Sequence, residues 1–253
     1  MKPFFLLLFS FLITKVYAQA VLDSHRVAKF SYAFSISPEG QWEGDGADSL
    51  LSIAHQHQLF LLGEYHGGVQ IPQLTSFLIR QLAPMGYKHH AAEISPAAQS
   101  ALRQVIQAPD PAVALQQIND RYYHRVQKSE PIPFFMGKQD AFILQALADK
   151  QIAFYGLDQE YVNGLPLWLN ELKSLPCWLE FGPPISWNAM DSLIDKTYRR
   201  DEADSRFNMF AYLLEHDTVR QFKEQVYAQG CAQAVVLFDA WEESMKIYGS
   251  NYQ

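Results

Sequence analysis

The stretch that most constrains this chain runs from Gln58 to Gly68 and reads QLFLLGEYHGG. Its four consecutive apolar residues, 59–62, lead into a polar turn bounded by glycines, a pattern typical of a buried strand in a parallel sheet. In open α/β sheets, ligands bind beyond the carboxyl ends of such strands. Glu64 and His66 lie at that end, and residues two apart in an extended chain point to the same side. This pair is therefore the first candidate for chemistry.

Two further segments predict neighbouring strands. Residues 89–94 follow a predicted helix over 71–82, and this order of strand, helix and strand indicates a right-handed βαβ unit, the core of a parallel sheet. Residues 152–158 predict a third strand, and the chain from about residue 176 has apolar residues mostly at helical spacing. The sequence thus predicts an α/β fold: a mostly parallel central sheet flanked by helices, with a helical C-terminal part.

Acidic residues end the second and third predicted strands as well. Glu93 and Asp158 are expected on the same rim as Glu64 and His66. In a partly desolvated cleft, carboxylates and an imidazole can hold a general base near neutral pH. His66 would take a proton from water or a substrate hydroxyl, and Glu64 or Glu93 would orient its ring. Because an acid at a strand end is also a common helix cap, a structural role stays open for each acid taken singly.

The same residue types are competent metal ligands. Glu64, His66 and Glu93 would supply two carboxylates and an imidazole to a divalent ion. The sequence alone leaves the choice between a metal site and a metal-free acid–base site open.

The first twenty residues match a signal peptide. Lys2 gives a short positive region, residues 4–13 form an apolar core, and small residues for cleavage end at Ala20. The core is shorter than the about 20 apolar residues that a membrane span needs. We expect cleavage and export to the periplasm or outside the cell, with an uncleaved interfacial anchor as the alternative. The mature chain, residues 21–253, is expected to form a single α/β domain with a helical subdomain from about residue 176.

The charge and the missing motifs narrow the range of partners. The formal net charge is −7 and there is no basic stretch, which argues against nucleic acid and against an anionic membrane surface. The sequence contains no phosphate-binding loop, dinucleotide fingerprint, serine nucleophile elbow or zinc-protease helix motif. We therefore expect a small-molecule or peptide substrate, and no transmembrane segment in the mature chain.

Cys177 and Cys231 are the only cysteines. An oxidising compartment permits a disulfide between them, whereas two buried thiols are the alternative. Their spacing gives no Cys-x-x-Cys pair, so metal binding by the cysteines alone is not expected.

Leu61–Gly67 and Ala92–Pro96, with the predicted helix between them, resemble the superfamily that joins erythromycin esterases, ChaN-like haem-uptake proteins and Tiki-type peptidases. Members of this superfamily share a strand that ends in Gly-Glu, followed after one or two residues by His. A second glutamate follows at the separation that His66 and Glu93 have here. Residues 155–160 resemble a further strand of the same fold, so that the resemblance covers residues 58–160.

The resemblance implies an exported hydrolase. His66 would activate water, while Glu64 and Glu93 position it or bind a divalent metal, and Asp158 would support the rim. In the ChaN-like branch, Tyr65 or His66 would instead bind haem or iron. Because the late strand with a second histidine that the esterase branch carries has no convincing match here, an inactive or truncated family member is the third alternative.

Overall fold

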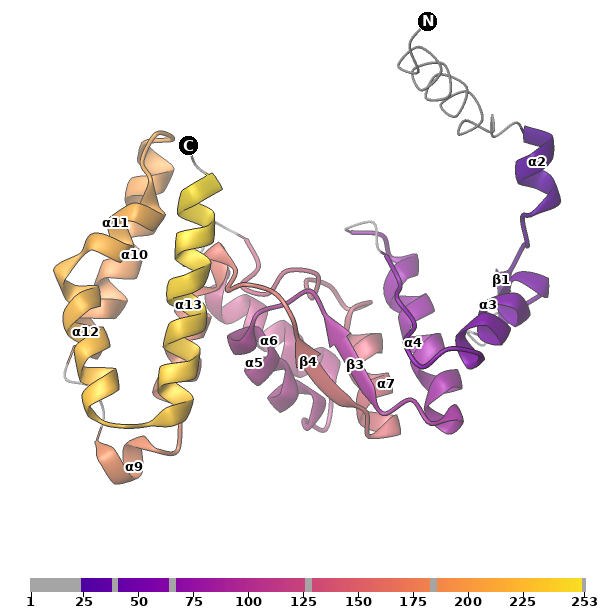
Figure 1. The fold of residues 1–253 in the computed structure, drawn as a ribbon, viewed down its shortest axis with the longest axis horizontal. Coiled ribbons are helices and arrows are strands. Elements are labelled where there is room, and N and C mark those ends of the chain that lie inside the picture. Colours follow the sequence, from indigo (N-terminus) through magenta and orange to yellow (C-terminus); the bar gives the residue numbers. More distant parts are fainter. Residues whose placement is uncertain (1–23, 38–40, 64–66, 126–128, 183–185, 252–253) are drawn as a thin grey trace, which may run out of the picture. The chain divides into compact units, whose positions relative to one another are not determined.

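The computed structural model describes residues 24–37, 41–63, 67–125, 129–182 and 186–251. The predicted signal peptide lies outside these ranges. The chain divides into two compact units, Met1–His57 and Gln58–Gln253, and each is described by itself. Figure 1 gives the order of the elements along the chain.

The first unit contains short elements only: α2 (Ser24–Lys29), β1 (Ser35–Ile36), β2 (Trp42–Glu43) and α3 (Asp45–His55). The two strands pair antiparallel. Gly46 allows α3 to start close to the preceding chain, because a Cβ at this position would lie 2.6 Å from the carbonyl oxygen of Tyr32. Its backbone N–H donates to the carbonyl oxygen of Ala33 (2.8 Å).

The second unit begins with helices around one parallel strand pair. Its first elements are α4 (Gln70–Leu82), η1 (Ala83–Met85), β3 (His89–Ala92), α5 (Pro96–Ile106), α6 (Pro111–Tyr123), α7 (Ala141–Lys150) and β4 (Ala153–Gly156). Two helix starts agree with the sequence. Ser95 Oγ accepts the Ala98 N–H at 3.1 Å, and Asp110 Oδ1 accepts the N–H of Val113 at 3.1 Å, each just before a proline in the first turn.

The remaining elements of the second unit are helical: η2 (Val162–Gly164), α8 (Leu165–Lys173), α9 (Trp178–Phe181), α10 (Trp187–Ala203), α11 (Met209–Glu215), α12 (Asp217–Ala228) and α13 (Ala232–Asn251). Their core is built on aromatic side chains. Trp168 of α8 stacks on Trp241 of α13 with ring centroids 4.9 Å apart, and both are fully buried. Among the described residues, no helix combines the length and the apolar character that crossing a membrane requires.

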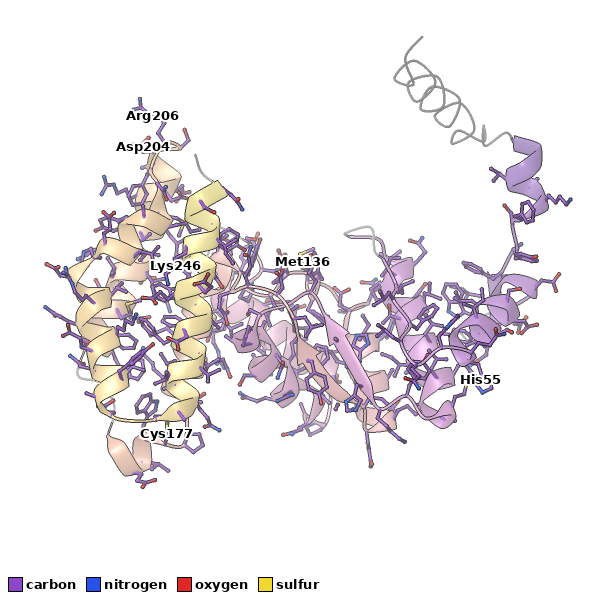
Figure 2. The ribbon with its side chains drawn as sticks, viewed as in Figure 1. His55, Met136, Cys177, Asp204, Arg206 and Lys246 are labelled. Atoms are coloured by element: carbon purple, nitrogen blue, oxygen red, sulfur yellow. A yellow bond between two sulfur atoms is a disulfide. The ribbon has the colours of Figure 1, made fainter. Side chains whose placement is uncertain are left out.

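A disulfide bonds Cys177 to Cys231, with the two Cα atoms 6.0 Å apart. It links the chain before α9 to the chain before α13, and Figure 2 labels Cys177 at the end of the helical part where α9 lies. The alternative of two buried thiols is therefore wrong.

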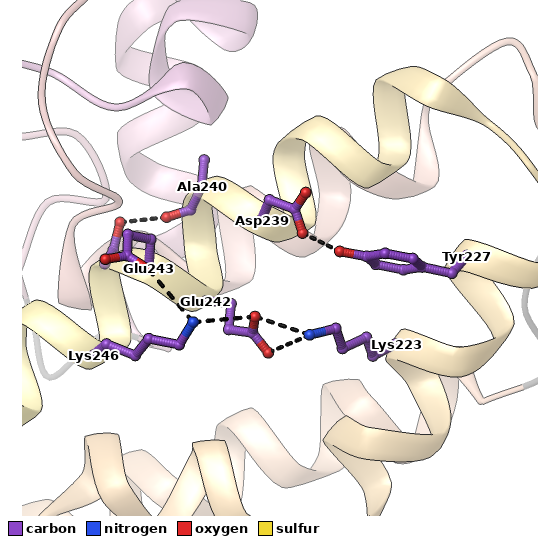
Figure 3. Close-up of polar contacts among 8 residues, drawn as sticks. Lys223, Tyr227, Asp239, Ala240, Glu242, Glu243 and Lys246 are labelled. Carbon is purple, nitrogen blue, oxygen red and sulfur yellow. Dashed lines mark hydrogen bonds and ion pairs between the residues drawn. The ribbon is translucent and has the colours of Figure 1, made fainter.

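Polar contacts also join α12 to α13 (Figure 3). Lys223 Nζ lies 2.7 Å from Glu242 Oε1 and 2.9 Å from its Oε2, and the Tyr227 hydroxyl donates to Asp239. Burial of Glu242 raises its pKa, but the ammonium of Lys223 outweighs this effect, and the pKa lies below its ordinary value. The carboxylate is thus ionised at neutral pH and its bond to Lys223 is charge-assisted.

The predicted fold class is wrong. Helices make up 64% of the structure, and the strands form only two-stranded sheets, of which one is parallel. The first predicted strand is missing, because residues 59–62 adopt no strand and Leu59 and Leu61 are 72% and 82% exposed. The described structure is thus a mainly helical protein with a small parallel strand pair, rather than a mostly parallel central sheet flanked by helices.

The physical reason lies in what a strand needs. A strand is stable only beside a neighbour that pairs with its backbone and covers its side chains, and residues 59–62 have no such neighbour in the described part of the chain. The helices pack against one another instead, with Leu102 of α5 and Leu144 of α7 fully buried in one apolar cluster.

Candidate functional site

The strand pair brings two of the predicted site residues to one edge. β3 and β4 run parallel, and Ala92 pairs with Gly156 at their carboxyl ends. The pairing continues beyond the strands, since the N–H of Asp158 donates to the carbonyl oxygen of Ile94 (3.0 Å). Glu93 and Asp158 therefore leave adjacent strands at the same end, and both are exposed. We call this edge the acidic rim.

Three predicted site residues, Glu64, Tyr65 and His66, lie outside the described residues. The chain on either side of them, at Gly63 and Gly67, is exposed and has room for a side chain, because a Cβ at either glycine would meet nothing within 4 Å. The described part of the predicted site thus consists of Glu93 and Asp158.

A third acid, Glu160, lies behind the acidic rim, and the sequence alone did not identify it as a candidate. Glu160 is only 1% exposed. Its Oε1 accepts the N–H of Ala97 in the first turn of α5 (3.0 Å), where the helix dipole favours an acid. Burial raises the pKa of Glu160 to about 7, against the opposing hydrogen bonds from Ser95 and Ala97. A carboxyl group directly behind the rim therefore changes charge near neutral pH.

Glu160 also connects the rim to the C-terminal helix. Its backbone N–H donates to Ser244 Oγ of α13 (2.7 Å). Tyr248, one turn further along α13, lies near the rim as well. Burial raises the pKa of the Tyr248 hydroxyl, a hydrogen bond with Gln159 opposes this, and the charges of Asp158 and Glu160 raise it further. The rim is thus built from β3, β4, the start of α5 and one face of α13.

A glycine makes the close approach behind the rim possible. A Cβ at Gly156 would lie 2.5 Å from the carbonyl oxygen of Ile94 and 2.7 Å from that of Ser95. The Gly156 N–H donates to Gln99 Oε1 of α5 (2.7 Å). The end of β4 is therefore held against the loop that leads from Glu93 into α5.

The histidines of β3 lie at its amino end, away from the rim. His90 stacks on the ring of Phe154 with centroids 5.9 Å apart, and burial lowers its pKa to about 4. His89 Nδ1 lies 3.2 Å from the hydroxyl of Tyr155. Both are accounted for by packing and local hydrogen bonds.

The described residues do not by themselves form a metal centre. No three histidine, cysteine, aspartate or glutamate side chains in this part of the chain lie close enough together to hold an ion. Glu93 and Asp158 would offer two carboxylates, which is fewer ligands than a zinc site takes from the protein.

The fold and the acidic rim define a mainly helical chain with a parallel strand pair that ends in acids. No protein-family model, curated protein or solved structure matches it. The resemblance to the esterase, ChaN-like and Tiki superfamily stays a prediction, and the functional proposals below rest on the residues themselves.

Proposed function

We propose that the protein is an exported hydrolase in which His66 and the acidic rim drive water onto an ester, amide or related bond. The observation that carries the proposal is the parallel pairing of β3 with β4, which places Glu93 and Asp158 at one edge. A third acid, Glu160, lies buried behind them with a pKa of about 7. Several acids in different environments are what acid–base hydrolysis requires.

We assign each group a separate role. His66 takes the proton of the attacking water, and Glu93 stabilises the imidazolium that forms. Asp158, whose Oδ1 accepts the N–H of Gln159 (2.8 Å), lies exposed at the rim, where a substrate can contact it. Glu160 is a positioning residue, because it is buried and acts by holding the start of α5.

The test is hydrolysis of a panel of chromogenic esters and short peptides by the purified mature protein. We expect His66→Gln to reduce kcat/KM by about 100-fold or more, the usual contribution of a general base, and Glu93→Gln to reduce it less. Glu224→Gln, an exposed acid on α12, is the matched control and should leave the rate unchanged. A His66→Gln protein as active as the wild type would contradict the assignment, and a panel without any turnover would favour the inactive family member.

Haem or iron binding is the second candidate function, and one observation favours it. Leu59, Leu61 and Leu62 are exposed immediately before Tyr65 and His66. Exposed apolar groups that lie together often mark a binding surface, and a haem face would cover them while Tyr65 or His66 binds the iron. Haem titration should then give a Soret shift that disappears in the Tyr65→Phe, His66→Ala double variant. A shift that survives in that variant would assign haem to another site.

A further inference from the structure

A cavity lies between α5, α6 and α8, away from the acidic rim. Glu93 and Asp158 do not line it. It is a cavity of about 190 Å³ that is open to solvent. Its apolar wall and its two charged groups come from different helices: Ala101, Val105, Ile118, Leu167, Arg121 and Glu171. The cavity is smaller than the about 300–1,000 Å³ of pockets for drug-sized ligands, so a ligand would have to be small.

Glu171 supplies the negative charge. Its side chain belongs to α8 and is only 4% exposed. Oε2 accepts hydrogen bonds from Ser100 Oγ (2.7 Å) and Gln104 Nε2 (3.1 Å), both of which are neutral donors. Burial raises the pKa of Glu171, although hydrogen bonds from Ser100 and Asn170 and the charge of Arg121 oppose the effect. A carboxylate has about four acceptor positions, so it can still receive a cationic donor.

Arg121 supplies the positive charge from α6, on the other side of the cavity. Arg121 is exposed. Its positive charge acts to lower the pKa of Glu171 and the pKa of Tyr122, and Arg121 is hydrogen-bonded to the Tyr122 side chain. A guanidinium presents a planar fork of donors that matches a carboxylate. One small cavity therefore offers a buried acceptor for a cation and an exposed fork for an anion.

We propose that this cavity binds a free α-amino acid with a branched aliphatic side chain. The ammonium group of the amino acid contacts Glu171, and its carboxylate contacts Arg121. Its side chain packs against Ala114 and Ile118 of α6, the half-buried apolar residues of the cavity wall. A simple cation would be repelled by the arginine and a simple anion by the glutamate, whereas a zwitterion satisfies both.

Isothermal titration of the mature protein with L-leucine at pH 7, where an α-amino group is mostly protonated, tests the proposal. Two analogues each lack one charge: leucinamide has no carboxylate, and 4-methylpentanoate has no ammonium group. We expect leucine to bind and each analogue to bind about 10- to 100-fold more weakly, the effect of losing one charged hydrogen bond. Arg121→Met should weaken leucine binding by a similar factor and bring leucine close to the wild-type affinity for leucinamide.

The variants have matched controls and a check on folding. Arg220→Met and Glu224→Gln, both on α12 outside the cavity, should bind leucine as the wild type does. Glu171→Gln should also weaken binding, but because it alters a buried group, its circular dichroism is compared with that of the wild type. If it fails to fold, the two analogues and the exposed Arg121→Met still decide. Absence of leucine binding, equal binding of leucinamide, or unchanged binding by Arg121→Met would each overturn the proposal.

Discussion

Glu160 should make the folded protein less stable as the pH rises from weakly acidic to neutral. Its carboxyl group is 1% exposed and has a pKa of about 7 in the folded state, against an ordinary value of 4.5. Between these two values the folded state holds a proton that the unfolded state has released. Stability then falls with increasing pH, because the folded state binds more protons than the unfolded one. The contribution is fully present below pH 4.5 and lost as the pH passes 7.

The magnitude follows from the two pKa values. At about 1.36 kcal/mol for each pH unit that separates them, the loss amounts to about 3 kcal/mol. This is a large share of the about 5–15 kcal/mol that separates folded from unfolded states in most proteins. At high pH the N–H of Ala97, at the start of α5, donates to the ionised carboxylate and offsets part of the cost of burying its charge. The loss of about 3 kcal/mol already includes this hydrogen bond.

Urea unfolding of wild type and Glu160→Gln at intervals from pH 4.5 to pH 9 measures the effect. The amide imitates the protonated acid, so the two proteins should be similarly stable at pH 5, and the variant should be more stable by up to about 3 kcal/mol at pH 8. Only the difference between the two curves is informative, because His90 contributes with the opposite sign. Burial lowers the pKa of His90 to about 4, and its contribution to stability is lost as the pH falls.

The control is Glu224→Gln, which changes an exposed acid on α12, outside the rim. Its difference from the wild type should stay flat across the pH range. A flat difference for Glu160→Gln as well, or a wild type that is the more stable protein at pH 8, would refute the reasoning.

Three further changes test the packing. Replacing Cys177 and Cys231 by serine should lower the free energy of unfolding by about 4 kcal/mol, because the bridge closes a loop of 54 residues in the unfolded chain. Adding a reductant to the wild type should lower the urea midpoint to a similar extent. Gly156→Ala should cost about 1–3 kcal/mol because its Cβ would meet backbone oxygen, whereas Gly63→Ala, with open space around it, should change the midpoint little. Leu61→Ser should alter stability by less than about 0.5 kcal/mol, since this side chain is 82% exposed; a loss of 2 kcal/mol or more, roughly what burial of a leucine contributes, would instead indicate the buried strand that the sequence predicted.

Local signals in the sequence predicted local structure well. Ser95 and Asp110, each followed by a proline, mark the starts of α5 and α6, because a cap is satisfied by backbone groups only two or three residues away. The helical period of residues 71–82 corresponds to α4 (Gln70–Leu82). Residues 89–94 and 152–158 were also predicted as strands that run in the same direction, and residues 89–92 and 153–156 form a parallel pair.

The sequence did not predict the structure correctly where it depends on contacts between residues that are far apart in the chain. The four apolar residues before Gly63 match the pattern of a buried strand. Whether they are buried depends on another strand and a helix that cover them, and a local sequence pattern does not show whether such partners are present. The apolar residues of α13 show the same dependence on distant partners, since Phe238 and Trp241 pack on Trp168 of α8. The disulfide was undecided in the sequence because the distance between its cysteines is set by the packing of α8 to α13.

The residues of the candidate site also divide into those that local sequence signals identify and those that depend on long-range contacts. Glu93 and Asp158 were found because each follows a strand, whereas Glu160 was overlooked although it lies two residues beyond Asp158. Its significance comes from burial at the start of α5 and from the bond of its N–H to Ser244 of α13, which are both long-range contacts. Since Glu160 contacts α5 through its carboxyl group and α13 through its backbone N–H, the protonation of this residue links the charge behind the acidic rim to the packing of the helical core. A pH change that alters the proposed hydrolysis should therefore alter the stability of the protein in the same pH range.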